Sequence, residues 1–408
     1  MDRFLRIYSI LFILIVIFVA TGCSKQKTGE LKVFQENPAN CESTSHKTRY
    51  VVKKKDGSIV RVYAKSREEM LEKYVRPKLE ELEIVESDQI IYANDLILGK
   101  GEITPNAQET WGAERIQASA AWNSGIKGQG VIVAVIDSGV ELTHPSLSSK
   151  IYTNIAEQNG ARNVDDDGNG LIDDIRGWDF AVESPTNHDT SGHGTHVAGV
   201  IAGSHTSGPM KGIAPDVKIL PLDFMDGASG YTSDAIESIN YAKKMGAKVI
   251  NASWGSSFCS KILEDTINLL VLDNVLFVAA AGNNGNDISR YPEFPAAFQS
   301  SAQITVGAIT KLGFMPSFSN WGQLVDVMAP GDEILSSYLH SDYAYLSGTS
   351  MAAPFVSGLA ALLIGKNPNL TVGQLKSIIL NSVTKRNYIV KTEGEINVPQ
   401  ALTVLNNL

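Results

Sequence analysis

Short apolar runs alternate with longer amphipathic stretches over most of the chain after residue 111. Runs rich in β-branched residues predict strands at 131–136, 217–220, 249–252, 275–280 and 304–306. Helical periodicity predicts helices among them at 193–203, 231–245, 260–273 and 350–365. Because near-continuous apolar strands separated by helices are buried on both faces, the pattern indicates an α/β fold with a parallel central sheet between two layers of helices. Functional residues of such sheets gather at the carboxyl ends of the strands.

The chain before residue 94 has a different pattern. Residues 49–63 read as two strands joined by a turn at Asp56 and Gly57, and a further strand is expected at 89–92. Between them, residues 66–83 carry apolar side chains at helical spacing, broken by a proline. The pattern predicts a small α+β unit over 47–94. Gly, Pro and Asn at 95–110 then predict a linker to a large domain at 111–408.

The first residues have the pattern of an export signal. Arginines precede an unbroken apolar stretch over 10–20, which is shorter than the roughly 20 residues of a membrane span. The stretch ends in small residues followed by Cys23. We therefore expect a signal peptide at 1–22, followed by a polar tether at 23–46.

Charge and cysteine content narrow the possible partners. The 408-residue chain has a net charge of −9 and no basic stripe, which argues against a nucleic-acid partner. Apart from Cys23, only Cys41 and Cys259 remain, so we expect no disulfide framework and a fold held by its core. We expect neither a redox nor an organic cofactor.

Three polar residues stand where predicted strands or helices end or begin. Asp137 follows a buried strand in AVIDSGV, His193 opens a Gly- and Ala-rich helix in SGHGTHVAGVIAG, and Ser350 lies in SGTSMAAP. Each alone has a structural explanation: a turn-forming aspartate, a packed core histidine, or a serine that caps a helix. Pro354 supports the last, because proline is tolerated in the first turn of a helix. Together the three supply a carboxylate, a base and a nucleophile, the set that activates a serine hydroxyl.

These motifs, in this order along the chain, resemble the active-site motifs of the subtilisin-like serine proteases. The resemblance implies a serine endopeptidase in which Asp137 orients His193, His193 transfers protons, and Ser350 forms an acyl-enzyme. It also implies that Asn283, in AAAGNNG, and the Ser350 N–H stabilise the oxyanion. An Asn beside Gly is equally a typical turn residue.

The resemblance extends to the edges that bind substrate. Ser253, Trp254 and Gly255 resemble the family's strand that pairs with the substrate backbone, and Gly227 and Gly230 lie in a stretch that resembles the opposing edge. A polypeptide substrate would then be held in extended form by strand addition. Taken alone, Trp254 fits a core position as well as a pocket wall.

The stretch DDDGNGLIDD at 165–174 is the densest cluster of oxygen ligands in the chain. Its alternate positions have the spacing of a calcium loop with glycines at the bend, although no Glu stands at the twelfth position. The ligands of a structural calcium ion would be Asp165, Asp167, Asn169, Asp173 and the Leu171 carbonyl. A solvated acidic turn is the alternative interpretation.

Two N-terminal segments have family counterparts. Residues 82–93 resemble the last strand of the inhibitory pro-domain, so 47–94 would be an intramolecular inhibitor removed by a cut between 94 and 108. A permanent accessory domain is the alternative. Residues 20–23 resemble the lipobox of bacterial lipoproteins, which implies lipidation of Cys23 and a membrane anchor. A conventional cleaved signal or an uncleaved anchor would export the protein as well. We expect a monomer.

Two other functions share these motifs. A catalytically inactive binding module would keep the fold, although every motif is present. A dedicated maturation protease would differ from a degradative one in its substrate pocket. An acidic pocket near 290–298 would indicate the maturation protease, because it would select basic side chains.

Overall fold

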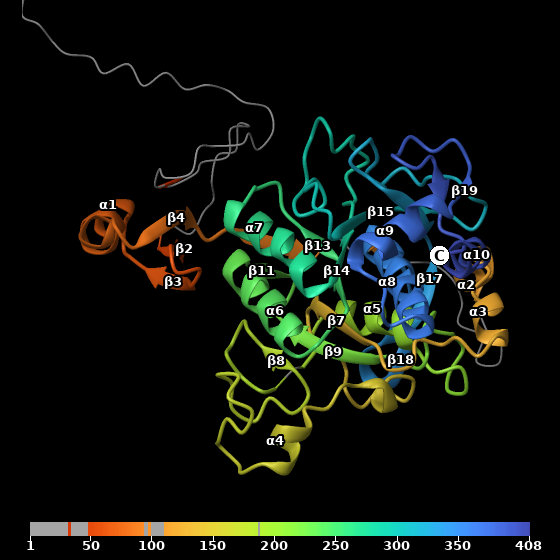
Figure 1. The fold of residues 1–408 in the computed structure, drawn as a ribbon, viewed down its shortest axis with the longest axis horizontal. Helices are drawn as coiled ribbons and strands as arrows, with labels where there is room; N and C mark the ends of the chain where they lie inside the picture. Colours follow the sequence, from red (N-terminus) through yellow and green to blue (C-terminus); the bar gives the residue numbers. More distant parts are fainter. Residues whose placement is uncertain (1–31, 34–47, 94–96, 99–109, 187) are drawn as a thin grey trace, which may run out of the picture.

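The computed structural model describes residues 32–33, 48–93, 97–98, 110–186 and 188–408 (Figure 1). The predicted signal peptide, Cys23 and most of the predicted tether and linker lie outside these residues.

A nine-stranded sheet forms the centre of the large domain, in the order β19-β20-β16-β15-β14-β12-β7-β9-β8. All neighbouring strands are parallel except β19 and β20. The strands are β7 (Ile132–Asp137), β8 (Trp178–Asp179), β9 (Lys218–Asp223), β12 (Val249–Ala252), β14 (Leu276–Ala280), β15 (Gln303–Ile309), β16 (Val327–Pro330), β19 (Thr384–Lys385) and β20 (Gly394–Glu395). The inner strands are largely apolar, and both of their faces are buried.

Helices cover this sheet on both faces, which confirms the predicted α/β fold (Figure 1). One layer contains α5 (His193–Ala202), α8 (Thr349–Lys366), α9 (Val372–Asn381) and α10 (Val398–Asn406). The other contains α6 (Thr232–Lys244) and α7 (Lys261–Leu269), followed by η4 (Leu270–Asp273). Short elements complete the domain: α2 (Trp111–Arg115), α3 (Ser119–Asn123), η3 (Ser148–Lys150), α4 (Ile155–Asn159) and η5 (Leu339–Ser341).

Helix α8 differs from the prediction in its relation to Pro354. The proline lies inside the helix, beyond its first turn, because the helix already begins at Thr349. Proline has no N–H to donate to the carbonyl four residues earlier, which is that of Ser350. Ser253 Oγ donates to that carbonyl instead, at 2.9 Å. A side chain from beyond the helix therefore replaces the missing helical hydrogen bond.

Helix α8 is also the one helix in the described part of the chain that is long and apolar enough, by length and composition alone, to cross a membrane. Nearly all of it is buried against the sheet and α5. Its apolar composition is therefore that of a core helix.

The N-terminal unit has its own four-stranded sheet, ordered β1-β4-β2-β3, and a separate small apolar core. Its elements are β1 (Lys32–Val33), β2 (Arg49–Lys54), β3 (Ile59–Tyr63), α1 (Arg67–Met70), η1 (Leu71–Val75), η2 (Arg76–Lys78) and β4 (Leu82–Ser87). The prediction of helical structure through residue 83 was wrong at its end, since the helical turns stop at Lys78 and Leu82 begins a strand.

Residues 82–93 also form two strands rather than the single strand expected. β4 stays in the N-terminal sheet, whereas β5 (Ile90–Ala93) joins two edges of the large domain. The chain changes sheets at Asp88, whose carboxylate accepts hydrogen bonds from the backbone N–H and hydroxyl of Ser233, at 2.9 and 2.7 Å. The two units are therefore joined by a shared sheet.

Two small sheets lie at the edge of the large domain. One has the order β10-β11-β5-β13, with β10 (Met225–Asp226), β11 (Ser229–Tyr231) and β13 (Trp254–Gly255). The other has the order β17-β18-β6, with β17 (Ile334–Tyr338), β18 (Asp342–Ser347) and β6 (Ile97–Leu98). The predicted linker thus contributes one short strand to the large domain.

Candidate active site

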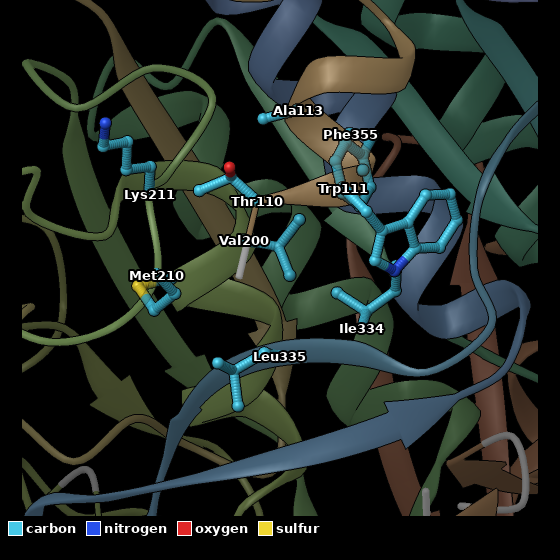
Figure 2. A pocket seen from close by; sticks show the side chains of 10 residues that line it. Thr110, Trp111, Ala113, Val200, Met210, Lys211, Ile334, Leu335 and Phe355 are labelled. Carbon is cyan, nitrogen blue, oxygen red and sulfur yellow. The ribbon is translucent and has the colours of Figure 1, made fainter. Parts of the chain in front are cut away.

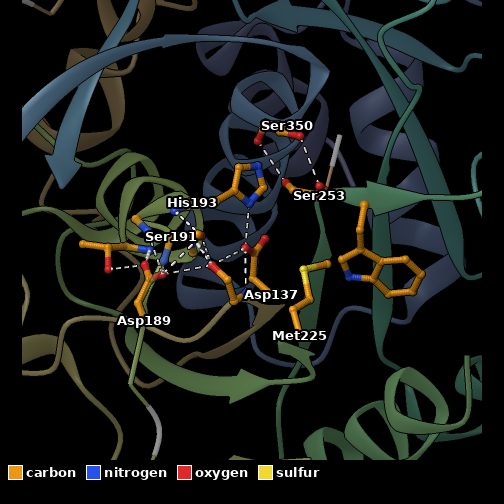
Figure 3. Close-up of polar contacts among 12 residues, drawn as sticks. Asp137, Asp189, Ser191, His193, Met225, Ser253 and Ser350 are labelled. Carbon is orange, nitrogen blue, oxygen red and sulfur yellow. Dashed lines mark hydrogen bonds and ion pairs between the residues drawn. The ribbon is translucent and has the colours of Figure 1, made fainter. Parts of the chain in front are cut away.

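Asp137 and His193 meet at the carboxyl end of the central sheet. Asp137 is the last residue of β7, and α5 begins at His193. His193 Nδ1 lies 2.6 Å from Asp137 Oδ1, and both side chains are buried (Figure 3). Gly194 allows this approach, because a Cβ there would lie 2.0 Å from the carbonyl oxygen of Gly139.

The charge on His193 depends on its carboxylate neighbours. Burial disfavours the imidazolium, but the attraction of Asp137 and its hydrogen bond outweigh burial, with a smaller contribution from Asp189. The pKa of His193 is therefore raised above its usual range. Figure 3 shows its ring between Asp137 and Ser350. Nε2 has no hydrogen-bond partner among the described residues.

Ser350 lies in the first turn of α8, beside this ring. Its Oγ donates to the carbonyl oxygen of Ser253 at 3.1 Å, so here the hydroxyl is turned toward Ser253 and not bonded to His193. A hydroxyl can rotate to suit its partner. Ser350 does not cap the helix, since the N-cap position belongs to Gly348.

Asn283 lies next to the start of the same helix. Its Oδ1 accepts hydrogen bonds from the N–H and the hydroxyl of Thr349, at 2.8 and 2.9 Å. Its Nδ2 is near Gly348, where a Cβ would lie 3.0 Å from it. The amide group is therefore oriented, and its donor end lies at the N-terminus of α8. Asn283 therefore does more than form a turn, because it hydrogen-bonds the first residue of α8 from a separate segment.

Ser253 belongs to a buried chain of polar side chains that reaches Ser350. Besides its bond to the Ser350 carbonyl, Ser253 Oγ accepts from Asn251 Nδ2 at 2.9 Å. Asn251 Oδ1 in turn accepts from Ser357 Oγ at 2.8 Å. All these side chains are buried. The hydrogen bonds join β12 to α8 at Ser350 and at Ser357, on either side of Pro354.

The structure decides between the two interpretations of Trp254. Its side chain is fully buried, packs edge-on against Phe224 and Phe277, and donates from Nε1 to the Ile136 carbonyl at 2.8 Å. It is thus a core residue, and only its backbone lies at the edge.

The two predicted substrate edges face each other across β5. Gly255 pairs with Tyr92 on one side, and Gly230 pairs with Ile91 on the other, both antiparallel. Gly227 lies in the turn that joins β10 to β11 and has φ +69°, a value that favours glycine. An extended segment can therefore add a strand between the edges, and residues 90–93 do so here.

Two buried aspartates near the site were not predicted. Asp189 accepts hydrogen bonds from the N–H groups of Gly192 and Thr195 and thereby holds the start of α5. An acidic residue just before a predicted helix is a typical capping residue, so the sequence could have predicted the role of Asp189. Asp223 is the register partner of Asp137 on β9. Burial, together with the charge of Asp179, raises the pKa of Asp223 to about 8. No sequence pattern marks this residue.

The acidic loop brings together a different set of residues from the predicted one. Carboxylate oxygens of Asp165 and Asp167 lie within 4.8 Å of each other and of a carboxylate oxygen of Glu157. Glu157 comes from α4 and was not predicted. Asp173 is turned away, because both its oxygens accept from the backbone N–H of Asn163.

Asn169 and Leu171, the other two predicted ligands, are joined to each other within the loop. Asn169 Oδ1 accepts from the Leu171 N–H at 2.7 Å, and Asn169 Nδ2 donates to Asp167 at 3.0 Å. The amide of Asn169 is thus occupied by hydrogen bonds inside the loop.

Two cavities lie away from these residues. One of about 20 Å³, between the start of α2 and helix α5, has room for about one water molecule (Figure 2). Its walls include Trp111, Val200, Met210 and Phe355. The other, of about 260 Å³, lies at the amino ends of β12 and β14 beside Lys248 and Asn274. Neither contains a predicted site residue.

Comparison with known proteins identifies the family. Residues 128–397 match the model of the subtilase family, peptidase S8. The chain belongs to the subtilase family. M-protease from Shouchella clausii (strain KSM-K16) is 36% identical over 286 residues, which are 69% of this chain and 67% of M-protease. Thermitase from Thermoactinomyces vulgaris is 35% identical over 288 residues, which are 69% of this chain and 92% of thermitase.

The fold of this subtilase also has a counterpart among solved structures. Fervidolysin from Fervidobacterium pennivorans, described as a keratinolytic enzyme related to subtilisin, superposes with a TM-score of 0.75. The match covers 93% of this chain and 64% of fervidolysin, at 22% identity. This likeness shows a subtilisin-like fold, and the named relatives show that the chain is a serine protease homologue.

Proposed function

We propose that this subtilase is an exported serine endopeptidase that hydrolyses polypeptides through an acyl-enzyme intermediate. The observation that carries the proposal is the 2.6 Å contact between His193 and Asp137, with the His193 ring between Asp137 and Ser350 (Figure 3). A catalytically inactive binding module would not need this arrangement.

Ser350 is the nucleophile of the proposed reaction. As Ser350 Oγ attacks the carbonyl carbon of the substrate, His193 Nε2 takes the hydroxyl proton, and Asp137 stabilises the resulting imidazolium. When the C–N bond breaks, His193 gives this proton to the leaving amine. A water molecule then attacks the ester, again with His193 as base, and releases the acid product and Ser350.

The negative charge on the attacked oxygen needs donors that are already in place. Asn283 Nδ2 supplies one, since Thr349 holds the other end of its amide. The Ser350 N–H, in the first turn of α8, supplies the second, because that N–H has no partner within the helix. Donors fixed before the reaction stabilise the transition state without reorganisation.

The N-terminal unit would act as an inhibitor, because β5 occupies the space between the two substrate edges. Charged contacts hold it there. Glu86 accepts from Ser260 Oγ and the Lys261 N–H, both at 2.7 Å, and Arg49 pairs with Asp234 at 2.6 Å. These contacts favour a pro-domain over a permanent accessory domain, since a retained β5 would block every substrate.

Removal of the pro-domain would be self-processing, with a cut between residues 94 and 108. The Ser350→Ala protein should then accumulate as a longer chain than the wild type, and purified wild-type enzyme added in trans should shorten it. Equal lengths of the two proteins, measured by intact mass, would contradict self-processing.

A calcium ion would bind at the acidic loop and stabilise it. Asp165, Asp167 and Glu157 provide three carboxylates close together, and calcium prefers such oxygen ligands. Its role would be structural, since the loop lies apart from Ser350. No step of the proposed reaction involves the ion.

Export and anchoring would depend on the N-terminal sequence. The signal at 1–22 would direct the chain out of the cytoplasm, and lipidation of Cys23 would tether it to a membrane, with release as a secreted form if the anchor is cut. Processing that is sensitive to globomycin, and lost in Cys23→Ala, is the expected result. Processing insensitive to globomycin would contradict lipidation.

The proteolytic activity is tested with purified, processed protein on casein and on fluorogenic peptides. We expect turnover by the wild type and by the control Ser149→Ala, which replaces an exposed serine of η3, but none by Ser350→Ala. Ser350→Ala would be obtained in processed form by trimming it with wild-type enzyme. Equal turnover by Ser350→Ala and the wild type would refute the proposal.

A further inference from the structure

Glu293 lies between the two chain segments that flank Ser350. A Cβ on Gly255 would be 3.2 Å from Glu293 Cγ and Oε1, and a Cβ on Gly282 would also be 3.2 Å from Glu293 Cγ. Gly255 belongs to β13, and Gly282 directly precedes Asn283. Because these two residues have no side chains, the Glu293 side chain packs directly against both segments, beside Asn320 Nδ2, which a Cβ on Gly282 would meet at 2.4 Å.

The space between these two segments is where the residue before the cleaved bond would place its side chain. Ser253 O accepts from Ser350 Oγ, and the Gly282 N–H donates to Thr349 Oγ1 at 3.0 Å, so both segments are tied to the nucleophile's helix. A substrate strand on β13 that presents its carbonyl to Ser350 must direct the side chain of the same residue between these segments. Glu293, which contacts Gly255 and Gly282, therefore lies where such a side chain would meet it.

The position of Glu293 is fixed by its backbone neighbours. Phe294 exchanges two hydrogen bonds with Ser256, N–H to carbonyl in both directions, at 2.7 and 2.8 Å. The segment with Glu293 is thereby paired to the residue that follows β13. The carboxylate is held beside the substrate edge and is not carried on a free loop.

Glu293 has no counter-charge in the part of the chain that the structure describes. Its side chain is half-buried, forms no ion pair there, and lies against Gly255 and Gly282, whose segments 253–258 and 279–286 contain no charged residue. Arg290, on the same segment, is exposed and lies against Tyr291. Burial alone raises the pKa of Glu293 to about 7. A desolvated carboxylate without a partner is costly, and a cation entering the space would relieve that cost.

We propose that Glu293 makes this protease selective for lysine or arginine immediately before the cleaved bond, by binding the cationic side chain. This inference rests on the proposed function, whose nucleophile and substrate edges it uses. Selection of basic residues favours cleavage at defined sites, as in the maturation of other proteins, over general degradation.

The test is a fluorogenic peptide library that varies only the residue before the cleaved bond. Wild-type enzyme should show its highest kcat/KM with Lys or Arg. Glu293→Gln, which keeps the shape of the side chain, should lower kcat/KM for those two by about 10- to 100-fold, the range for a hydrogen bond to a charged group. It should leave peptides with Leu or Phe unchanged or improved. The control Glu264→Gln removes a carboxylate paired with Lys261 on α7 and should change neither class.

The pH dependence gives a second readout. Because the carboxylate binds the cation only when ionised, the ratio of kcat/KM for Lys over Leu peptides should rise as the pH passes through about 7 and then level off. The ratio cancels the titration of His193, which affects both substrates equally. In Glu293→Gln the ratio should be low at every pH.

The outcomes separate this inference from the proposed function. Active enzyme that prefers Leu or Phe, with a profile unchanged in Glu293→Gln, would overturn the role of Glu293 and leave the protease intact. No turnover of any peptide by processed wild-type protein would overturn the proposed function itself.

Discussion

Replacing Ser253 by alanine would expose how α8 accommodates a proline next to its nucleophile. The substitution removes the donor to the Ser350 carbonyl, which Pro354 leaves without a helical partner, and removes the acceptor for Asn251 Nδ2. All these groups are buried. Each buried polar group that loses its hydrogen-bond partner costs about 1–3 kcal/mol, so Ser253→Ala should lower the free energy of unfolding by about 2–4 kcal/mol.

A second substitution tests the cause of that loss. Pro354→Ala restores an N–H that can donate to the Ser350 carbonyl four residues earlier. In the Ser253→Ala background this should recover about 1 kcal/mol more than the same change recovers in the wild-type background. The effects of Pro354→Ala on helix propensity and on the unfolded chain occur in both backgrounds and cancel in the double-mutant cycle.

The assay is urea unfolding followed by tryptophan fluorescence. All four proteins carry Ser350→Ala, which keeps the carbonyl and prevents autolysis. A coupling energy within about 0.5 kcal/mol of zero would refute the reasoning, because it would mean that Ser253 and Pro354 do not act on the same carbonyl.

Three further predictions concern the site and its support. Burial raises the pKa of Asp223 to about 8, so between about pH 4 and pH 8 it stays protonated in the folded protein but ionises in the unfolded chain, and stability falls as the pH rises. Asp223→Asn should therefore stabilise the protein by a few kcal/mol at pH 8 and little at pH 4, and an equal gain at both would contradict this. Asn283→Ala should lower kcat by about 10²- to 10³-fold with little change in KM, and a loss under tenfold in folded protein would count against an oxyanion role. Chelation should lower the melting temperature of the wild type but not of Asp165→Asn, whereas a melting temperature unmoved by chelator would argue against calcium.

The sequence was sufficient for the five central strands of the sheet, β15, β14, β12, β7 and β9, but not for β8, β16, β19 and β20. Strands such as 276–280, buried on both faces, are apolar at every position and are visible without an alignment. Asp137 and His193 each mark the end of a strand or the start of a helix, so their placement follows from the topology.

What the sequence could not predict depends on contacts between distant segments. Asp223 is near Asp137 only because β9 pairs with β7 in that register. Glu157 contributes a carboxylate to the acidic loop from α4. The carboxylate of Asp173 accepts a hydrogen bond from the Asn163 N–H and is not part of the carboxylate cluster. Pro354 was placed in a first turn because its replacement donor, Ser253, is about a hundred residues away. Local pattern contains none of this information.

The central claim is that His193 and Asp137 make Ser350 an active nucleophile, and labelling with a fluorophosphonate tests it most directly. Processed wild-type protein should form one adduct per chain, located on the Ser350 peptide by mass spectrometry. His193→Ala should label far more slowly, although Ser350 is still present. Correctly processed wild-type protein that forms no adduct, or that is labelled at a serine other than Ser350, would contradict the account.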